Sequence, residues 1–372
     1  MLSTYIENCD EEAKFIRDNL RILVAGGDGT VTWILGTIAD LGLYPAPPVA
    51  IMPLGTGNDL SINLGWGGKF EDKWIKGRNV YHTLLEYQDA FVQPIDFWSL
   101  TAQAPDAKYF NNLPHCVRKD PEDNSKITSR FWNYFSVGLD AEAAYGFHSL
   151  REEHPSLASS RLLNQAWYSF FSCKTGWFCG AQPLDDFVSI QIKSGPNSQW
   201  SELEIPASIR AIVVLNLQTY GGGRDLWGIE NEHNLKVKGF TRPLYNDGLM
   251  EVVGLKNGWH TALVMGELNS KSVHAKRLGQ CYSLQMKLKV PHRNSQRVKA
   301  IPLYMQVDGE PWEQMVPTFD PFKANQDEDL PHLSVTLHYG GTSRMLANAR
   351  PIGSKKVESI LFRAREYSNA SE

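Results

Sequence analysis

Apolar runs and helical patterns alternate through the first hundred residues. Residues 11–20 predict a helix, and the short apolar run at 21–25 predicts a buried strand. The helical spacing of apolar residues at 31–38, with Thr30 placed as its N-cap, predicts a second helix. A second apolar run at 49–54 predicts another buried strand. This strand–helix–strand order is typical of an α/β fold, here an N-terminal domain with a parallel sheet.

The pattern changes after Asp96. Residues 101–129 are polar and contain three prolines, which is typical of a linker or a surface insertion. From Phe131 onward, short apolar or alternating runs predict strands and therefore a mainly β domain. The Asp-Gly pair at 308–309 predicts a β-hairpin turn, because glycine tolerates positive φ. We expect four parts: an α/β domain at 1–100, a linker or insertion at 101–129, a β-rich domain at 130–342 and a basic tail at 343–372.

Composition narrows the protein class. The chain has 372 residues, 42% of them hydrophobic, which argues against global disorder. A net charge of −4 argues against a whole-chain nucleic-acid binder. The five cysteines form no CxxC pair, so neither a disulfide framework nor a zinc module is indicated, and a reducing compartment is expected. Apolar runs fall far short of the roughly 20 residues a membrane-spanning helix needs, and the N-terminus lacks the features of a secretory signal.

Two glycine-rich turns each follow a predicted strand, one at 26–30 (GGDGT) and one at 55–59 (GTGND). Because parallel strands end at the same sheet edge, these turns predict a nucleotide-binding crevice. Glycines let backbone N–H groups approach phosphate, whereas the Asp28 carboxylate would act through a cation or a water. The alternative is that the glycines serve only tight turn geometry. The chain has no P-loop, no Rossmann fingerprint and no protein-kinase HRD or DFG element.

A family resemblance rests on five segments. GGDGTVTWIL and PLGTGNDLSINLGWG resemble the catalytic domain of eukaryotic diacylglycerol kinases, and NYFSVGLDAE, YNDGLMEVVG and QVDGEPWEQ are similar to their accessory domain. The likeness is greatest to the compact plant type without zinc modules, and it runs from about Asn19 to about Gly340. Each motif alone is shared with lipid, sphingosine and NAD kinases, but the five in this order are specific.

The resemblance implies ATP-dependent phosphorylation of diacylglycerol to phosphatidic acid, with Mg²⁺, in a cleft between two domains. It implies catalytic roles for Asp28, Asp308 and Glu310, with Glu310 as the base, and metal-binding roles for Asp28 and Asp247. A carboxylate that accepts the proton of the attacking hydroxyl typically contributes ~10²–10⁴-fold. The residues that the resemblance places around the nucleotide are Gly26, Gly27, Asp28, Gly29, Thr30, Gly55, Thr56, Gly57, Asn58, Asp59 and Asp96.

The sequence departs from the family at its start. The family's catalytic domain usually begins with a strand that leads into a glycine-containing Asn-Pro segment near ATP. Nothing before Arg21 contains a glycine, a proline or a strand-like run. We therefore expect the first strand and one phosphate contact to be missing. Two alternatives stay open: a related kinase acting on sphingosine or ceramide, and a truncated, inactive lipid-binding chain.

Membrane contact is the remaining expectation. Residues 271–299 hold eight Lys or Arg and no Asp or Glu, which indicates either a face toward anionic lipid or a solvated edge of the β domain. The aromatic stretch 167–178 is either a lipid-facing rim or core, and core is the commoner role of such residues. We expect a cytoplasmic protein that associates peripherally with an anionic membrane, takes diacylglycerol as substrate and binds no nucleic acid. The oligomeric state is not indicated.

Overall fold

The chain folds into two compact units. The computed structural model describes residues 10–154, 183–228, 230–256, 275–288, 302–317 and 332–348. The first unit consists of Met1–Ile95, Thr219–Gly223 and Thr342–Glu372, and the second of Asp96–Gln218 and Arg224–Gly341. Two long strands, β3 (Phe91–Gln103) and β15 (Leu333–Ala347), run from one unit into the other. The predicted tail at 343–372 lies mostly outside the described residues.

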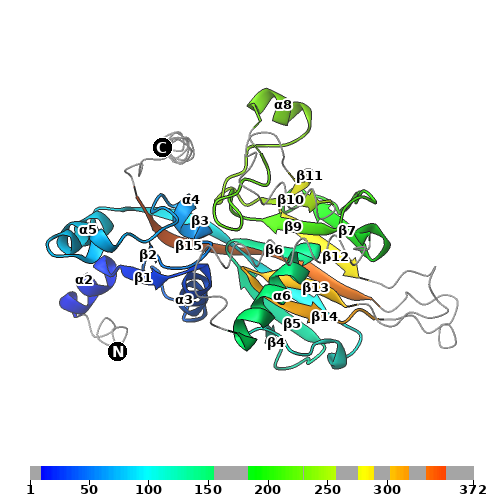
Figure 1. Cartoon of the computed structure of the whole chain (residues 1–372), viewed down its shortest axis with the longest axis horizontal. Coiled ribbons are helices and arrows are strands. Elements are labelled where there is room, and N and C mark those ends of the chain that lie inside the picture. The colour runs from blue at the N-terminus through cyan, green and yellow to red at the C-terminus, as the bar shows by residue number, and fades with distance from the viewer. Residues whose placement is uncertain are drawn as a thin grey trace, which may run out of the picture. The chain divides into compact units, whose positions relative to one another are not determined.

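The first unit is an α/β structure (Figure 1). Its strands β1 and β2 pair in parallel, in the register Ile22↔Val49 to Gly26↔Pro53, and Met345 of β15 pairs in parallel with Val49. The buried apolar run of β2 explains this central position. The elements of the first unit are α2 (Glu11–Asn19), β1 (Ile22–Gly26), α3 (Asp28–Asp40), β2 (Val49–Pro53), α4 (Asp59–Asn63), the short 3₁₀ helix η1 (Asp72–Ile75) and α5 (Asn79–Gln88).

The start of α3 differs from the sequence prediction. Its N-cap is Gly27, with extended backbone, and the helix begins at Asp28 instead of after Thr30. No side chain caps this end. An acidic residue in the first turn is favoured by the positive end of the helix dipole, so Asp28 is well tolerated there.

The second unit contains two β sheets (Figure 1). One has the strand order β4-β5-β3-β15-β12-β7-β8, and the other has the order β11-β10-β9-β6-β13-β14. Its elements are η2 (Ala107–Tyr109), β4 (Arg118–Lys119), β5 (Lys126–Phe131), β6 (Tyr134–Gly138), α6 (Leu139–Glu153), η4 (Leu184–Asp186), β7 (Val188–Lys193), β8 (Ser201–Leu203), β9 (Ala211–Leu215), α8 (Glu232–Val237), β10 (Met250–Leu255), β11 (Lys276–Cys281), β12 (Ser283–Leu288), β13 (Leu303–Val307) and β14 (Glu310–Gln314).

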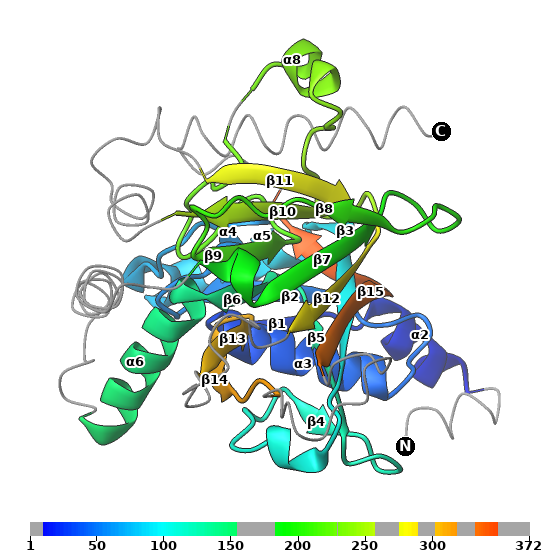
Figure 2. The same cartoon turned by 90° about the vertical axis from the view of Figure 1, so that its right-hand side faces the viewer.

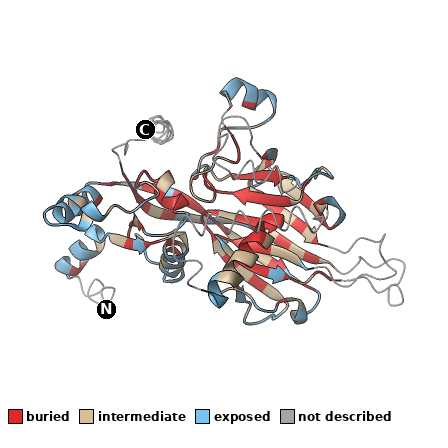
Figure 3. Cartoon of the chain, viewed as in Figure 1, coloured by how far each residue is buried: buried red, intermediate tan, exposed pale blue. Residues whose placement is uncertain are grey.

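One hydrophobic core joins the two sheets of the second unit. Met286 and Leu337 contribute to it from the first of these sheets, and Val214 and Met305 from the second. The strands with the most buried residues, such as β9 and β10, are drawn almost wholly as buried in Figure 3, whereas α2 and α5 of the first unit are mostly exposed. In β12 the apolar residues are buried and two polar ones lie partly exposed, as the alternation predicted.

Residues 101–129, predicted as a linker or insertion, contribute a few apolar side chains to this core. They include the end of β3, all of β4 and part of β5, and Phe110, Val117 and Ile127 are buried among the core residues. The polar and proline-rich composition reflects the turns between these short elements, while a few apolar positions anchor them.

Helix α6 packs against β6, β13 and β14 within the second unit (Figure 2). It follows β6 directly, so the chain turns from sheet to helix at Gly138. This packing places α6 next to the β13–β14 hairpin. That hairpin carries Asp308 and Glu310, two of the residues singled out from the sequence.

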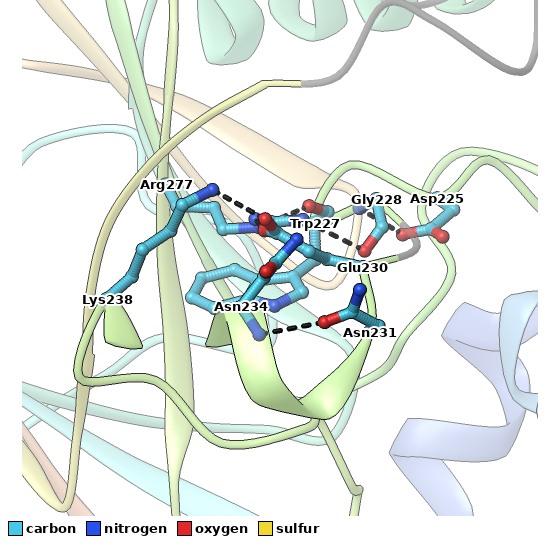
Figure 4. Close-up of polar contacts among 8 residues, drawn as sticks. All are labelled: Asp225, Trp227, Gly228, Glu230, Asn231, Asn234, Lys238 and Arg277. Carbon is cyan, nitrogen blue, oxygen red and sulfur yellow. Dashed lines mark hydrogen bonds and ion pairs between the residues drawn. The ribbon is translucent and has the colours of Figure 1, made fainter. Parts of the chain in front are cut away.

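A polar cluster fixes the segment around α8 to β11 (Figure 4). The Arg277 guanidinium lies over the Trp227 ring, donates from Nε to the Trp227 carbonyl and forms an ion pair with Glu230. Lys238 also pairs with Glu230, at 2.6 Å. Arg277 lies within the basic stretch 271–299, so one positive charge of that stretch is already paired with a carboxylate of the protein. Much of that stretch, like the aromatic stretch 167–178, lies outside the described residues.

The α/β class expected from the sequence is confirmed. Parallel pairing is found at β1, β2 and the end of β15, whereas β4–β5, β6–β9 and the other pairings described within the second unit are antiparallel. The missing first strand stays a prediction. Among the described residues, no helix is long and apolar enough to cross a membrane.

Candidate active site

The two glycine turns of the first unit are in direct backbone contact. A Cβ at Gly55 would lie 2.5 Å from the Cα of Gly27, and one at Gly27 would lie 2.9 Å from the Cα of Gly55. The Gly26 carbonyl accepts a hydrogen bond from the Leu54 amide beside this contact. Glycine is therefore needed at both positions for the turns to pack, whether or not a phosphate also approaches them. The parallel pairing of β1 with β2 brings them together, as expected for a shared sheet edge.

Asp28 links the first turn to the second. Its Oδ2 accepts a hydrogen bond from the Asp59 amide at 2.9 Å, and its Oδ1 accepts one from the Leu60 amide at 3.1 Å. These are the first amides of α4, so Asp28 satisfies backbone donors that would otherwise lack partners in the helix. The sequence predicted a cation- or water-organising role for Asp28, and the structure adds this structural one.

Asn58 shapes the second turn. It has a left-handed backbone (φ 58°), its Oδ1 accepts from the Gly55 amide, and its Nδ2 donates to the carbonyls of Gly55 and Gly68. Asparagine tolerates this backbone conformation better than most residues. Its position in the turn is thus explained by local geometry, in addition to the nucleotide-site role that the resemblance implies.

Asp59 holds a third segment that the sequence prediction missed. Its Oδ2 accepts from the Gly222 amide at 2.9 Å and its Oδ1 from the Gly223 amide at 2.8 Å. These glycines belong to residues 219–223, which join the first unit although they lie far along the chain. The run of three glycines at 221–223 was the sequence signal that could have found this segment.

The three segments meet around Gly57. A Cβ there would lie 3.2 Å from Oδ2 of Asp28, 3.4 Å from Oδ2 of Asp59 and 3.9 Å from the Gly222 amide nitrogen. Two carboxylate oxygens thus approach one point, which suits Mg²⁺, an ion commonly bound by one or two carboxylates together with waters and phosphate oxygens. The described residues contain no group of three or more His, Cys, Asp or Glu placed to bind a metal by themselves.

The second unit carries the predicted catalytic turn between β13 and β14. Asp308 (φ 49°) and Gly309 (φ 88°) both have positive φ, which matches the Asp-Gly hairpin turn predicted from the sequence. The Asp308 carboxylate accepts the backbone amides of Trp132, Asn133 and Tyr134 at 2.8 to 3.0 Å. Burial raises its pKa to about 7, although these three donors act to lower the pKa. Asp308 therefore fixes the turn and does not face solvent.

Glu310 is more exposed than Asp308. Its side chain is 40% exposed, and its Oε2 lies 3.5 Å from Nε2 of His148 on α6. His148 in turn lies beside Arg151 and Glu152 of the same helix. Of the two carboxylates of this turn, Glu310 is the one a substrate hydroxyl could reach. His148 is a neighbour that the sequence did not suggest.

Asp96 and Asp247 lie close together, also in the second unit. Asp96 is buried; its Oδ2 accepts the Gly248 amide at 2.8 Å and its Oδ1 accepts the Tyr339 hydroxyl at 3.3 Å. Burial raises its pKa. Asp247 has an exposed residue surface, yet surrounding protein and the Asp96 charge raise its pKa to about 7. Nearby Glu251, 1% exposed, has a pKa raised well above the ordinary value by burial and by Asp247.

Asn216 connects Asp96 with the Asp308 turn, and the sequence prediction missed it too. Its Nδ2 donates to the carbonyls of Asp96 and Trp132, and its Oδ1 accepts the Trp98 indole N–H. Because the Trp132 amide donates to Asp308, one buried amide side chain ties both acidic sites together. A single asparagine after an apolar strand gives no sequence signal for such a role.

Comparison with known proteins decides the family. The diacylglycerol kinase catalytic domain matches residues 3–82, and the diacylglycerol kinase accessory domain matches residues 130–311. The chain belongs to the diacylglycerol kinase family. The two matched ranges contain nearly all the residues singled out from the sequence, with Asp96 between them.

Two similar relatives are plant diacylglycerol kinases, which confirms the plant-type resemblance expected from the sequence. The chain is 38% identical to diacylglycerol kinase 4 of Arabidopsis thaliana over 337 residues, and 37% identical to diacylglycerol kinase 7 of the same plant over 338 residues. Each match covers 84% of this chain and 66% of the relative, so the chain spans slightly less than two thirds of their length. The crystal structure of a putative diacylglycerol kinase from Bacillus anthracis str. Sterne is 16% identical, with a TM-score of 0.43, and the match covers 90% of this chain and 80% of that one.

Proposed function

We propose that this protein transfers the γ-phosphoryl group of ATP to the primary hydroxyl of diacylglycerol and forms phosphatidic acid. The observation that carries the proposal is the close packing of two glycine turns, with Asp28 and Asp59 around them, in a chain of the diacylglycerol kinase family. The named relatives are diacylglycerol kinases, which favours this substrate over sphingosine or ceramide.

The nucleotide phosphates would bind at the start of α3. This helix has 13 residues and no side chain caps its N-terminus, so its positive end can stabilise an anion. Gly26, Gly27 and Gly55 present no side chain beyond the backbone there, which lets phosphate oxygens come close. Mg²⁺, held by Asp28 together with phosphate oxygens, would supply charge neutralisation.

The chemical step needs a base at the lipid hydroxyl. The hydroxyl oxygen attacks the γ-phosphorus, the bond from that phosphorus to the bridging oxygen of ADP breaks, and the hydroxyl proton passes to the Glu310 carboxylate. Asp308 supports this step by holding the turn through three backbone amides. Asp96 and Asp247 would support the site from the neighbouring acidic pair, with Asp247 as the candidate for a structural cation.

Diacylglycerol resides in membranes, so the proposed activity requires contact with a lipid surface. We propose peripheral association with an anionic membrane on its cytoplasmic side. The described part of the basic stretch contributes exposed Lys276, while Arg277 is already paired with Glu230.

The test is a phosphorylation assay with Mg-ATP and mixed micelles that contain phosphatidylserine and one of three lipids: diacylglycerol, sphingosine or ceramide. We expect labelled phosphatidic acid from diacylglycerol alone, and no product from an Asp28→Ala variant. Circular dichroism and thermal unfolding would establish that the variant is folded. Product from sphingosine or ceramide but not from diacylglycerol would overturn the substrate assignment. Absence of product from all three, with the wild-type chain folded, would overturn the proposed activity for this chain.

A further inference from the structure

Residues 221–223, at the end of the segment 219–223, have a backbone that only glycine adopts readily. Gly221, Gly222 and Gly223 have φ values of 56°, 95° and 100°, three consecutive residues in the left-handed half of conformational space. Each such position disfavours a side chain, and a run of three is far more restrictive than one. Residues 221–223 therefore need contacts from another segment of the first unit to keep this conformation.

That constraint is a polar network on α4. The Asp59 carboxylate accepts the amides of Gly222 and Gly223, and Asn63, one helical turn further on, donates from Nδ2 to the Thr219 hydroxyl at 2.6 Å. Asp59 and Asn63 are both buried. Hydrogen bonds to a charged acceptor in a buried place are stronger than those between neutral groups. Two side chains of one short helix thus fix both ends of the segment.

The segment reaches the point where the two predicted phosphate turns meet. The Gly222 amide lies near Gly57, as do Asp28 and Asp59, and Gly223 leaves space for the Ile62 side chain, which would be 3.3 Å from a Cβ there. The main chain at 221–223 carries no side chains that could block a ligand. It is therefore built in the same way as the turns at 26–30 and 55–59.

We propose that residues 219–223 form a third glycine segment of the nucleotide site, and that Asp59 is the positioning residue that holds this segment in place. The inference rests on the proposed nucleotide binding and deepens it, because it assigns the Asp59 carboxylate to a protein contact. The ligand class is a nucleoside triphosphate, whose phosphates the side-chain-free backbone can approach closely. Asp59 acts on the ligand through the segment.

Hydrogen–deuterium exchange measures the positioning directly and does not depend on activity. In the wild-type chain, peptides that contain Gly222 and Gly223 should exchange slowly without ligand. In Asp59→Asn, an amide NH₂ replaces one accepting oxygen and opposes a backbone N–H, so exchange in these peptides should be faster by about tenfold or more. The matched control is Asp120→Asn, since Asp120 also accepts two backbone amides, from Glu122 and Asp123, but in an exposed turn of the second unit. It should leave exchange at 219–223 unchanged.

A second variant covers the case in which Asp59→Asn does not fold. Thr219→Val removes the hydroxyl that Asn63 contacts and keeps the side-chain shape. It should also raise exchange at 219–223, with a smaller effect than Asp59→Asn. Unchanged exchange in the folded Asp59→Asn variant, or in Thr219→Val if only that variant folds, would overturn the positioning role.

Mg-ATP separates this inference from the proposed function. We expect ATP to slow exchange in wild-type peptides at 26–30, 55–59 and 219–223. Slowing at the first two ranges but not at 219–223 would overturn the third segment and leave the proposed function standing. Slowing at none of them, at saturating ATP, would overturn both. In the kinase assay, Asp59→Asn should raise KM for ATP about tenfold while KM for diacylglycerol stays within a factor of two; an unchanged KM for ATP would also count against the inference.

Discussion

The acidic turns of the two units use their carboxylates differently. In the first unit, Asp28 and Asp59 each accept two backbone amides from another segment, and one oxygen of each approaches Gly57. In the second unit, two carboxylates divide the tasks of holding the backbone and facing a ligand. Asp308 is buried and accepts three backbone amides, whereas Glu310 is partly exposed. A carboxylate in a functional motif can therefore organise the backbone, face a ligand, or do both. Contacts distinguish these roles, and motif membership does not.

The largest expected effect tests the division of tasks in the second unit. Glu310→Gln keeps the size of the side chain and removes its ability to accept a proton. We expect turnover with diacylglycerol to fall by roughly 10²–10⁴-fold, with ATP affinity within a few-fold of wild type. Steady-state kinetics in mixed micelles and calorimetric ATP binding provide the two measurements.

His148→Gln is the matched variant for this test, because His148 touches Glu310 without being assigned the proton-accepting role. We expect a much smaller loss of turnover from it. An unchanged turnover number for Glu310→Gln would place the base elsewhere. Lost ATP binding in that variant would assign Glu310 to the nucleotide.

The next effect concerns Asp308 and pH. Its pKa rises from the ordinary 3.8 to about 7 on folding, so the folded chain binds this proton more tightly than the unfolded chain. Asp308 therefore favours folding at low pH, and its contribution is lost as pH rises from about 4 to about 7. The loss amounts to up to about 4 kcal/mol in the free energy of unfolding.

The measurement is the difference in unfolding free energy between wild type and Asp308→Asn, taken from urea titrations between pH 4 and pH 7. Other acids of the second unit titrate in both proteins and largely cancel in this difference. Wild type should lose stability relative to the variant as pH increases. The prediction would be contradicted by a stability difference that does not change with pH, or by one that shifts toward a more stable wild type as pH rises. Either result would show that the three amide donors lower the pKa of Asp308 at least as much as burial raises it.

A medium effect tests why the first unit needs its glycines. Gly55→Ala places a methyl group 2.5 Å from the Cα of Gly27, so the two turns must separate. Overpacking of this kind typically costs about 1–3 kcal/mol, and we expect weaker ATP binding to accompany it. Gly195→Ala is the control, since its Cβ would meet only a serine hydroxyl at 3.5 Å. Normal stability with lost ATP binding in Gly55→Ala would indicate that this glycine serves the ligand alone.

The sequence predicted the parts that depend on local pattern. In the first unit, α2, β1, α3 and β2 follow the apolar spacing, and the Asp-Gly signal located the β13–β14 turn. The pattern failed where long-range contacts decide: Asn216, His148 and residues 219–223 join their sites only after folding. It also could not show that Asp28 accepts the first amides of α4, because the partners lie 31 and 32 positions away. Polar partners at such distances leave no periodic signal.

The smallest expected effect completes the comparison of the two turns. Gly309 has φ 88°, but a Cβ there would meet only the Tyr134 hydroxyl at 3.8 Å, an ordinary contact. Gly309→Ala should therefore cost about 1 kcal/mol, from backbone strain alone, and should leave ATP affinity unchanged. Thermal unfolding and calorimetry of this variant beside Gly55→Ala would separate conformational strain from steric overlap. A methyl group in open space adds no steric overlap. A loss of stability in Gly309→Ala as large as that in Gly55→Ala would therefore contradict this prediction and would mean that the β13–β14 turn is as tightly packed as the glycine turns.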